Sequence, residues 1–97
     1  MAVTTYVNWE GITAQQYDEA RNVVNWENDP PPGLLFHVAA FDGTAGHFTD
    51  IWETAEAFQE FIEQRVAPGM AQVGVTSQPD PQIRPVHAVF TPGFQPK

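Results

Sequence analysis

Two side chains of the sequence, His37 and Asp50, could act together in proton transfer. An imidazole that a carboxylate holds in place has a fixed orientation and can accept or donate a proton near neutral pH. The two residues are well separated in the sequence, so they meet only if the chain between them folds back on itself. The chemistry therefore depends on the structure of that segment.

The segment around these two residues has the pattern of a β-hairpin. Apolar and aromatic residues come first, turn-forming residues follow at positions 42–46, and β-forming residues then resume. Strands that pair symmetrically about this turn place His37 opposite Asp50 and Leu35 opposite Trp52. A shift of one residue would move the imidazole and the carboxylate to opposite faces of the sheet. The hairpin thus predicts a His37–Asp50 pair beside an indole. This pair either transfers protons in a reaction or is a hydrogen bond that only stabilises the structure.

Further side chains could complete a small-molecule cleft. His87, on the last predicted strand, faces either the cleft or a subunit contact. Tyr17, on the first predicted helix, either directs its hydroxyl group into the cleft or belongs to the core. Trp52, Phe58 and Phe61 would make an apolar wall suited to a flat aromatic ligand, although a packed core uses the same residues.

Other kinds of site have weaker support. His37, Asp50 and His87 are suitable ligand types for zinc or iron, but they come from separate strands and no local spacing supports a metal site. Ser77 is the single serine and lies in a polar connection, which does not favour a serine triad. No glycine-rich phosphate loop stands between a strand and a helix. We therefore expect neither a metal nor a cofactor.

The remaining elements follow from local patterns. Thr13 and Gln16 form a capping box that starts a helix, which must stop before the proline run at 30–32. Thr54 caps a second helix, whose apolar face is continuous until Pro68 and Gly69 end it. The other predicted segments are a first strand at 2–10, a polar connection at 74–84, a fourth strand at 85–91 and a tail at 92–97.

The predicted order is β-α-β-β-α-β, which is the ferredoxin-like α+β arrangement in a single domain over residues 1–97. Right-handed crossovers place both helices on one face of a four-stranded antiparallel sheet. If the opposite face met water, it should be polar. It is not polar, because the hairpin contributes to it Phe36, Val38, Ala40, Thr49 and Ile51. We therefore expect a homodimer that buries this face.

Composition excludes several classes of partner. The 97 residues carry a formal net charge of −8 with four Lys and Arg side chains, so phosphate backbones and anionic lipid surfaces would be repelled. The chain has no cysteine, which excludes disulfides and thiolate metal sites. No apolar run is long enough for a membrane span, and no signal peptide is evident. We expect a cytoplasmic protein that binds neither nucleic acid nor membranes.

The segment 50–61, preceded by the strand at 33–37, resembles the dimeric α/β-barrel superfamily and most of all its antibiotic biosynthesis monooxygenase group. The similarity covers nearly the whole chain. It implies a homodimer of ferredoxin-like subunits, each with a small-molecule cleft between sheet and helices. Members of the superfamily oxygenate electron-rich aromatic substrates without metal or flavin, degrade haem, cyclise polyketide-like chains or isomerise lactones.

The resemblance extends to some pocket residues and not to others. Asn8 matches a position at which several oxygenating relatives place a polar pocket residue, and Trp52 matches their strand-three tryptophan. The histidine that is common on the second helix of that group is absent, and Phe61 occupies its position. This departure weakens the haem-degrading and typical oxygenase interpretations and leaves the polar chemistry to the strand histidines.

Two classes of function remain open. The first is a cofactor-free enzyme, monooxygenase-like or a cyclase or isomerase, that acts on an apolar aromatic or polyketide-like substrate through His37 and Asp50. The second is a non-catalytic ligand-binding or stress-response protein with the same cleft.

Overall fold

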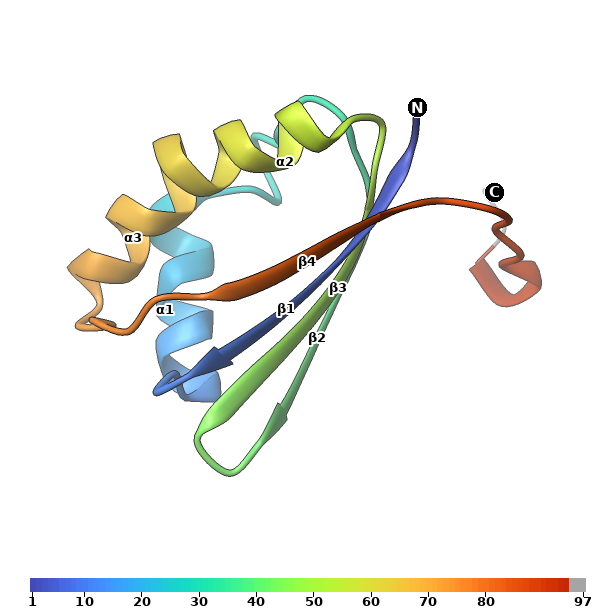
Figure 1. Cartoon of the computed structure of the whole chain (residues 1–97). Helices are drawn as coiled ribbons and strands as arrows, with labels where there is room; N and C mark the ends of the chain where they lie inside the picture. The colour runs from blue at the N-terminus through green and yellow to red at the C-terminus, as the bar shows by residue number, and fades with distance from the viewer. Residues whose placement is uncertain (95–97) are drawn as a thin grey trace.

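The computed structural model describes residues 1–94, and it consists of one antiparallel sheet with helices packed on one face (Figure 1). The strands are β1 (Val3–Glu10), β2 (Leu34–Asp42), β3 (Ala45–Trp52) and β4 (Asp80–Pro85), in the order β2-β3-β1-β4. The helices are α1 (Ala14–Val24), α2 (Ala55–Phe61), the π-helix η1 (Ile62–Val66), α3 (Ala67–Gln72) and the 3-10 helix η2 (Pro92–Phe94). This arrangement confirms the predicted ferredoxin-like fold. None of the helices described is long and apolar enough to cross a membrane.

The β2–β3 hairpin has the predicted register over most of its length. His37 lies opposite Asp50, and Ala39 lies opposite Phe48. The prediction is wrong at the open end, where an irregularity lets Leu34 instead of Leu35 pair with Trp52. Leu35 is the extra residue of this bulge and is 58% exposed.

Side-chain caps start both main helices as predicted. The Thr13 hydroxyl group accepts from the Gln16 N–H, and the Gln16 side chain accepts from the Thr13 N–H in return. The Thr54 hydroxyl group accepts from the Ala57 N–H at the start of α2. Helix α1 ends at Asn25, which adopts a left-handed conformation with φ of 63°.

The second helical segment is longer than predicted, because Pro68 and Gly69 do not end it. Helices α2, η1 and α3 run without a break from Ala55 to Gln72, and we call this unit the long helix. In its π-wound turn the Ala67 N–H donates to the Ile62 carbonyl, five residues earlier. Pro68 therefore sits in the first turn of the next segment, where a missing N–H is tolerated.

The fourth strand was predicted at 85–91, but β4 covers Asp80–Pro85 and pairs with β1 from Asn8 to Val3. Its polar, proline-containing sequence is tolerated because β4 is an edge strand that bonds on one side only. Val86 donates to the carbonyl of Ala2, just before β1, and residues 87–91 are not in a strand. The predicted tail contains η2 at Pro92–Phe94, and its residues 95–97 lie outside the part of the chain that the structure describes.

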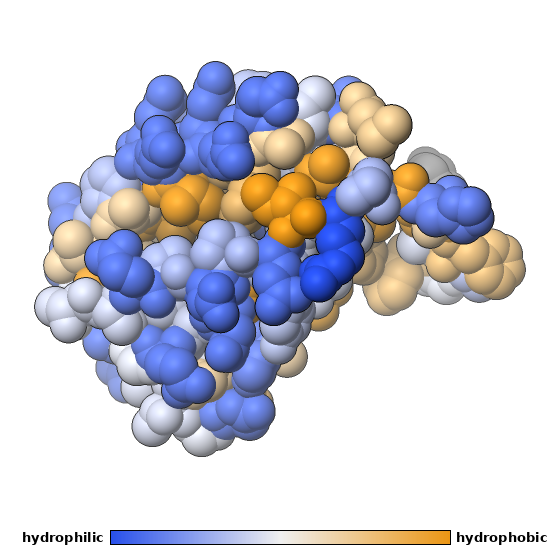
Figure 2. All heavy atoms as spheres, viewed as in Figure 1, coloured by the Kyte–Doolittle hydropathy of each residue, from blue (hydrophilic) through white to orange (hydrophobic). Residues whose placement is uncertain are grey.

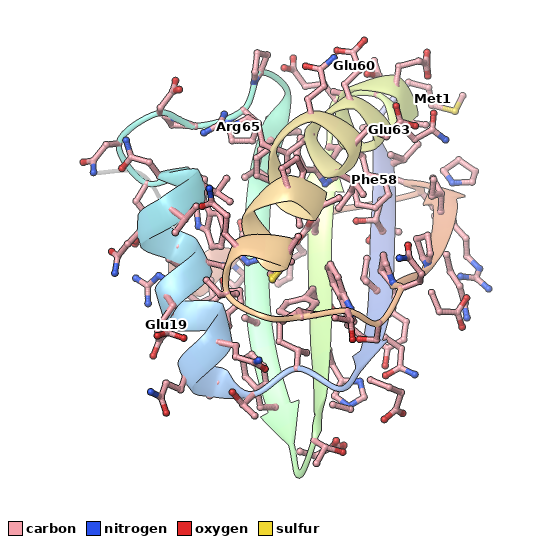
Figure 3. All side chains as sticks on the ribbon, turned by 90° about the vertical axis from the view of Figure 1, so that its left-hand side faces the viewer. Met1, Glu19, Phe58, Glu60, Glu63 and Arg65 are labelled. Atoms are coloured by element: carbon pink, nitrogen blue, oxygen red, sulfur yellow. The ribbon has the colours of Figure 1, made fainter. Side chains whose placement is uncertain are left out.

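The core lies between the inner sheet face and the helices (Figure 1). Alternate β1 residues Val3, Thr5, Val7 and Trp9 are buried there. Figure 3 shows Phe58 of the long helix on the side of the sheet, while Glu60 and Glu63 lie on the opposite side. The long helix thus presents the apolar face that the sequence predicts and leaves Glu60 and Glu63 exposed to water.

Candidate functional site

A narrow cavity opens between the inner sheet face and the long helix. Its volume is about 50 Å³ when measured as the space open to the centre of a water-sized sphere. Its walls come from the sheet, from α1 and the turn after it, and from the long helix: Val7, Trp9, Tyr17, Trp26, Leu34, His37, Phe48, Asp50, Trp52, Phe58, Phe61, Ile62, Val66 and Met70. We call it the first cavity. Apart from a small polar group, its lining is apolar and aromatic, which is typical of small-molecule sites.

The polar group is built on the hairpin. Asp50 is 7% exposed, and its two carboxylate oxygens are held by different donors. Oδ1 lies 2.6 Å from His37 Nδ1, and Oδ2 accepts from Trp52 Nε1 at 3.1 Å. His37 is brought opposite Asp50 by the strand pairing, and Trp52 lies two residues further along β3 on the same face. The predicted imidazole, carboxylate and indole therefore meet.

Asp50 determines which imidazole nitrogen can act as a base. A carboxylate accepts hydrogen bonds, so it favours the tautomer in which His37 carries its proton on Nδ1. This leaves a lone pair on Nε2. Tyr17, which α1 places across the cavity, has its hydroxyl oxygen 2.7 Å from that Nε2 atom. When the imidazole is neutral, the Tyr17 hydroxyl group donates to Nε2 of His37, and Nδ1–H of His37 donates to Asp50.

Burial keeps the phenol of Tyr17 protonated. It raises the pKa of Tyr17 to about 12, an effect that the charge of Arg21 opposes and the charge of Asp50 adds to. At neutral pH, Tyr17 is therefore a hydrogen-bond donor and a neutral group.

Aromatic rings surround the imidazole. The His37 ring is stacked with Tyr17 at 6.1 Å and with Phe48 at 6.2 Å between ring centroids. The Trp26 ring lies edge-on to it at 6.0 Å. Trp52 continues this surface by contacting the Phe58 ring at 5.8 Å. The imidazole of His37 thus lies in apolar surroundings of low dielectric constant, lined by aromatic rings on which a planar ligand can stack.

Not all predicted site residues reach the first cavity. It is lined by His37, Asp50, Tyr17, Trp52, Phe58 and Phe61. Asn8 does not line it, because Asn8 pairs with His47 on the opposite face of the sheet, between the inward-facing Val7 and Trp9. His87 does not line it either, because it lies beyond the end of β4 and is exposed. Neither side chain lines the first cavity, and the alternative of a subunit contact for His87 stays a prediction.

A metal site of His37, Asp50 and His87 would need all three side chains together, and His87 lies outside the first cavity. Within residues 1–94, no group of three or more His, Asp or Glu side chains is placed to hold a metal ion. His37 and Asp50 bind each other, and their other close partners are the aromatic residues Tyr17 and Trp52.

Sequence reasoning missed Trp26 as a cavity residue. A first helix that ran on towards the proline run at 30–32 would include Trp26, but α1 stops at Val24 and the left-handed Asn25 turns the chain. Trp26 then reaches over Tyr17, His37 and Phe61. Arg65 of the long helix holds this turn by donating to the carbonyls of Val24 and Asp29, at 2.9 and 2.8 Å. An asparagine followed by an aromatic residue at a helix end was the available signal.

Solved structures with the same fold are numerous and distant in sequence. SnoaB from Streptomyces nogalater, a cofactor-independent oxygenase, is 12% identical over 91% of this chain and 95% of its own, with a TM-score of 0.65. A protein of Chloroflexus aurantiacus provisionally classed as an antibiotic biosynthesis monooxygenase is 16% identical over 91% and 96% of the two chains, with a TM-score of 0.60. The chain shares the fold of antibiotic biosynthesis monooxygenase-like proteins.

The same fold also occurs without an assigned activity. A protein of unknown function from Nitrosomonas europaea is 17% identical over 96% of both chains, with a TM-score of 0.64. No protein-family model matches the sequence. The comparison with curated proteins gives no match. An argument for the activity must therefore come from the cavity itself.

The raised pKa of Tyr17 predicts a stability loss at alkaline pH. The folded chain holds the phenolic proton more tightly than the unfolded chain, whose ordinary value is 10.0. The free energy of unfolding should therefore be unaffected by this group below pH 10 and fall by up to about 3 kcal/mol as the pH rises towards 12. Urea unfolding at a series of pH values measures this loss.

Replacement of Tyr17 by Phe should remove that part of the pH dependence, and Tyr6→Phe, on the outer sheet face, should retain it. An equal alkaline loss in Tyr17→Phe and in the unmodified chain would contradict the assignment to Tyr17.

Proposed function

We propose that the chain is a cofactor-free enzyme that removes a proton from an apolar, aromatic or polyketide-like substrate in the first cavity. The observation that supports this most directly is the His37–Asp50 contact of 2.6 Å inside an otherwise apolar, aromatic box. A histidine that is held by a buried carboxylate and faces a narrow apolar cavity has the arrangement of a general base.

In the proposed reaction, the substrate stacks between the aromatic walls and brings an acidic C–H or O–H group to His37. Nε2 takes this proton, and Asp50 stabilises the imidazolium cation through Nδ1–H. The electron pair stays on the substrate as a delocalised anion. In a monooxygenase-like reaction, molecular oxygen as co-substrate adds to that anion at a CH2-derived carbon, the resulting peroxide takes the proton from His37, and loss of water leaves a carbonyl group. In a cyclase or isomerase reaction, the anion rearranges and takes the proton back from Nε2. Tyr17 must first release Nε2, and its neutral hydroxyl group can then donate to the substrate oxygen.

A second candidate is a ligand-binding or stress-response protein without catalysis. The bond between Tyr17 and Nε2 favours it, because this bond occupies the basic lone pair in the absence of a ligand. In that case the polar group holds the cavity together, and a bound molecule leaves chemically unchanged.

Replacement of His37 by Ala tests the proposal. With anthrone, an aromatic probe that has an acidic C–H group, we expect the unmodified chain to consume oxygen or convert the probe. His37→Ala should reduce the rate by at least about 100-fold, the usual contribution of a general base. Oxygen consumption and product chromatography measure turnover, and circular dichroism checks that the fold persists.

His87→Ala is the matched control, because His87 is exposed outside the cavity. It should keep full activity. If His37→Ala is folded and as active as His87→Ala, His37 is not the base. Anthrone that binds and is recovered unchanged from the unmodified chain would favour the non-catalytic alternative.

We further propose that the chain forms a homodimer through the outer sheet face, which faces away from the helices. This face carries apolar side chains that the chain itself leaves exposed, such as Val38 at 43% and Tyr6 at 39%. The segment after β4 continues on the side of the sheet that faces away from the helices (Figure 1), and its Phe94 ring contacts the Phe36 ring of the outer face at 5.8 Å. An apolar sheet face of this kind is typical of an interface. The net charge of −8 also supports our proposal that neither nucleic acid nor an anionic membrane is a partner, and a cytoplasmic location stays a prediction.

Val38→Glu should dissociate the dimer, because it would bury a charge without a partner in the interface. Val23→Glu is the control, since Val23 is 47% exposed on α1, away from the outer face. Sedimentation equilibrium should give a monomer for Val38→Glu and a dimer for Val23→Glu and the unmodified chain. A monomeric unmodified chain would refute the interface.

A further inference from the structure

A second cavity lies beside the first, between the long helix and the segment that leads to β4. Its volume is about 470 Å³ when measured as the space open to the centre of a water-sized sphere. It is lined by Trp9, Ile62, Glu63, Ala67, Met70, Ala71, Val75, Thr76, Ser77, Gln78 and Pro79. Three of these side chains, Trp9, Ile62 and Met70, also line the first cavity. The two cavities therefore meet at a partition that is one side chain thick.

The partition has a fixed side and a movable side. Trp9 is fixed, because its Nε1–H donates to the carbonyl and the hydroxyl oxygen of Ser77 at 3.1 and 3.2 Å. Met70 belongs to the buried core, but its side chain is unbranched, has no hydrogen bond to break and adapts to the shape of its surroundings more readily than a branched side chain. Ile62 is half-buried at the start of the π-wound turn. A ligand that passes from one cavity to the other would displace Met70.

The chemistry of the second cavity indicates what it could accept. Its buried lining residues are Trp9, Met70 and Val75, which are apolar, apart from one indole N–H that is bonded to Ser77. Its exposed lining residues include the polar Thr76 and Gln78. Glu63 is its only charged lining residue. Figure 2 shows hydrophobic side chains in the band between the long helix and β4, with hydrophilic side chains on either side. An uncharged apolar chain fits this space, and an anionic group does not.

We propose that the second cavity is a chamber for the tail of the substrate. The reactive aromatic end lies against His37 in the first cavity, and an uncharged alkyl-like chain extends past Met70 into the second. This inference rests on the proposed function, which supplies the orientation of the reactive end. It adds that the natural substrate is elongated, with an apolar extension remote from the acidic proton.

The affinity for 4-alkylphenols of increasing chain length tests the chamber. Phenol alone reports on the first cavity, and each added methylene group reports on the second. Isothermal titration with phenol, 4-butylphenol and 4-octylphenol should show an affinity that rises by up to about fourfold per methylene group, as expected for burial in an apolar space.

Ala71→Phe should fill the second cavity and abolish this dependence on chain length while phenol binds as before. Ala71 is exposed on the long helix and lines only the second cavity, so a larger side chain does not disturb the core. Gln72→Phe is the matched control, because the neighbouring Gln72 lines neither cavity. Ala67→Phe replaces Ala71→Phe if circular dichroism shows that the latter does not fold.

The outcomes separate the two proposals. If phenol binds and the chain length has no effect, or if its effect survives in Ala71→Phe and Ala67→Phe, the tail chamber is refuted and the first cavity stands. A different result would be that phenol does not bind at all, whereas long-chain alkylphenols bind and Ala71→Phe abolishes their binding. The first cavity would then not be the site of the aromatic ring. A change of oligomeric state in Ala71→Phe would show that a second copy of the chain occupies this space, which also refutes the chamber.

Discussion

The buried carboxylate of Asp50 is the constraint around which the cavity is organised. A carboxylate out of water is costly unless donors satisfy it, and here an imidazole N–H and an indole N–H do so from the same sheet face. Both donors are available because the hairpin register puts His37 opposite Asp50 and keeps Trp52 on the same side. A slip of one residue would leave the carboxylate without these two partners.

The aromatic residues follow from this arrangement. With Nδ1 committed to Asp50, the other nitrogen of His37 needs a donor, and Tyr17 supplies it from α1. Phe48, Trp26 and Tyr17 enclose the ring and keep the surroundings apolar, which strengthens the electrostatic coupling between imidazole and carboxylate. The same low-polarity box that holds this relay is what an aromatic substrate would need. The same aromatic contacts around His37 thus stabilise the fold and would bind the substrate.

Local patterns in the sequence were sufficient for the hairpin, the helix caps and the element order. They predicted the His37–Asp50 pair because a tight turn determines strand register over several residues. They failed where long-range pairing overrides local preference. β4 formed on the proline-containing segment that lies opposite β1, and the β-rich segment that contains His87 has no strand to pair with.

Two features of the site needed the three-dimensional structure. The bulge at Leu35 depends on how β2 enters the sheet, and the position of Trp26 depends on the turn that follows Asn25. Asn8 was expected in the cleft from resemblance alone, and strand alternation places it on the other face. The hydrogen bond of Tyr17 to Nε2 depends on the orientation of α1 over the sheet, which helical periodicity does not specify.

Nitrogen-15 NMR of the histidine rings tests the central claim most directly, at a pH where the imidazoles are neutral. In the unmodified chain, the His37 ring should be the Nδ1–H tautomer, with its proton at low field because of the short bond to Asp50. In Asp50→Asn, that low-field proton should disappear while the spectrum of the rest of the chain remains that of a folded protein. If His37 carries its proton on Nε2, or if its signals are the same in both proteins, Asp50 does not orient the base and the proposed proton-transfer site is wrong.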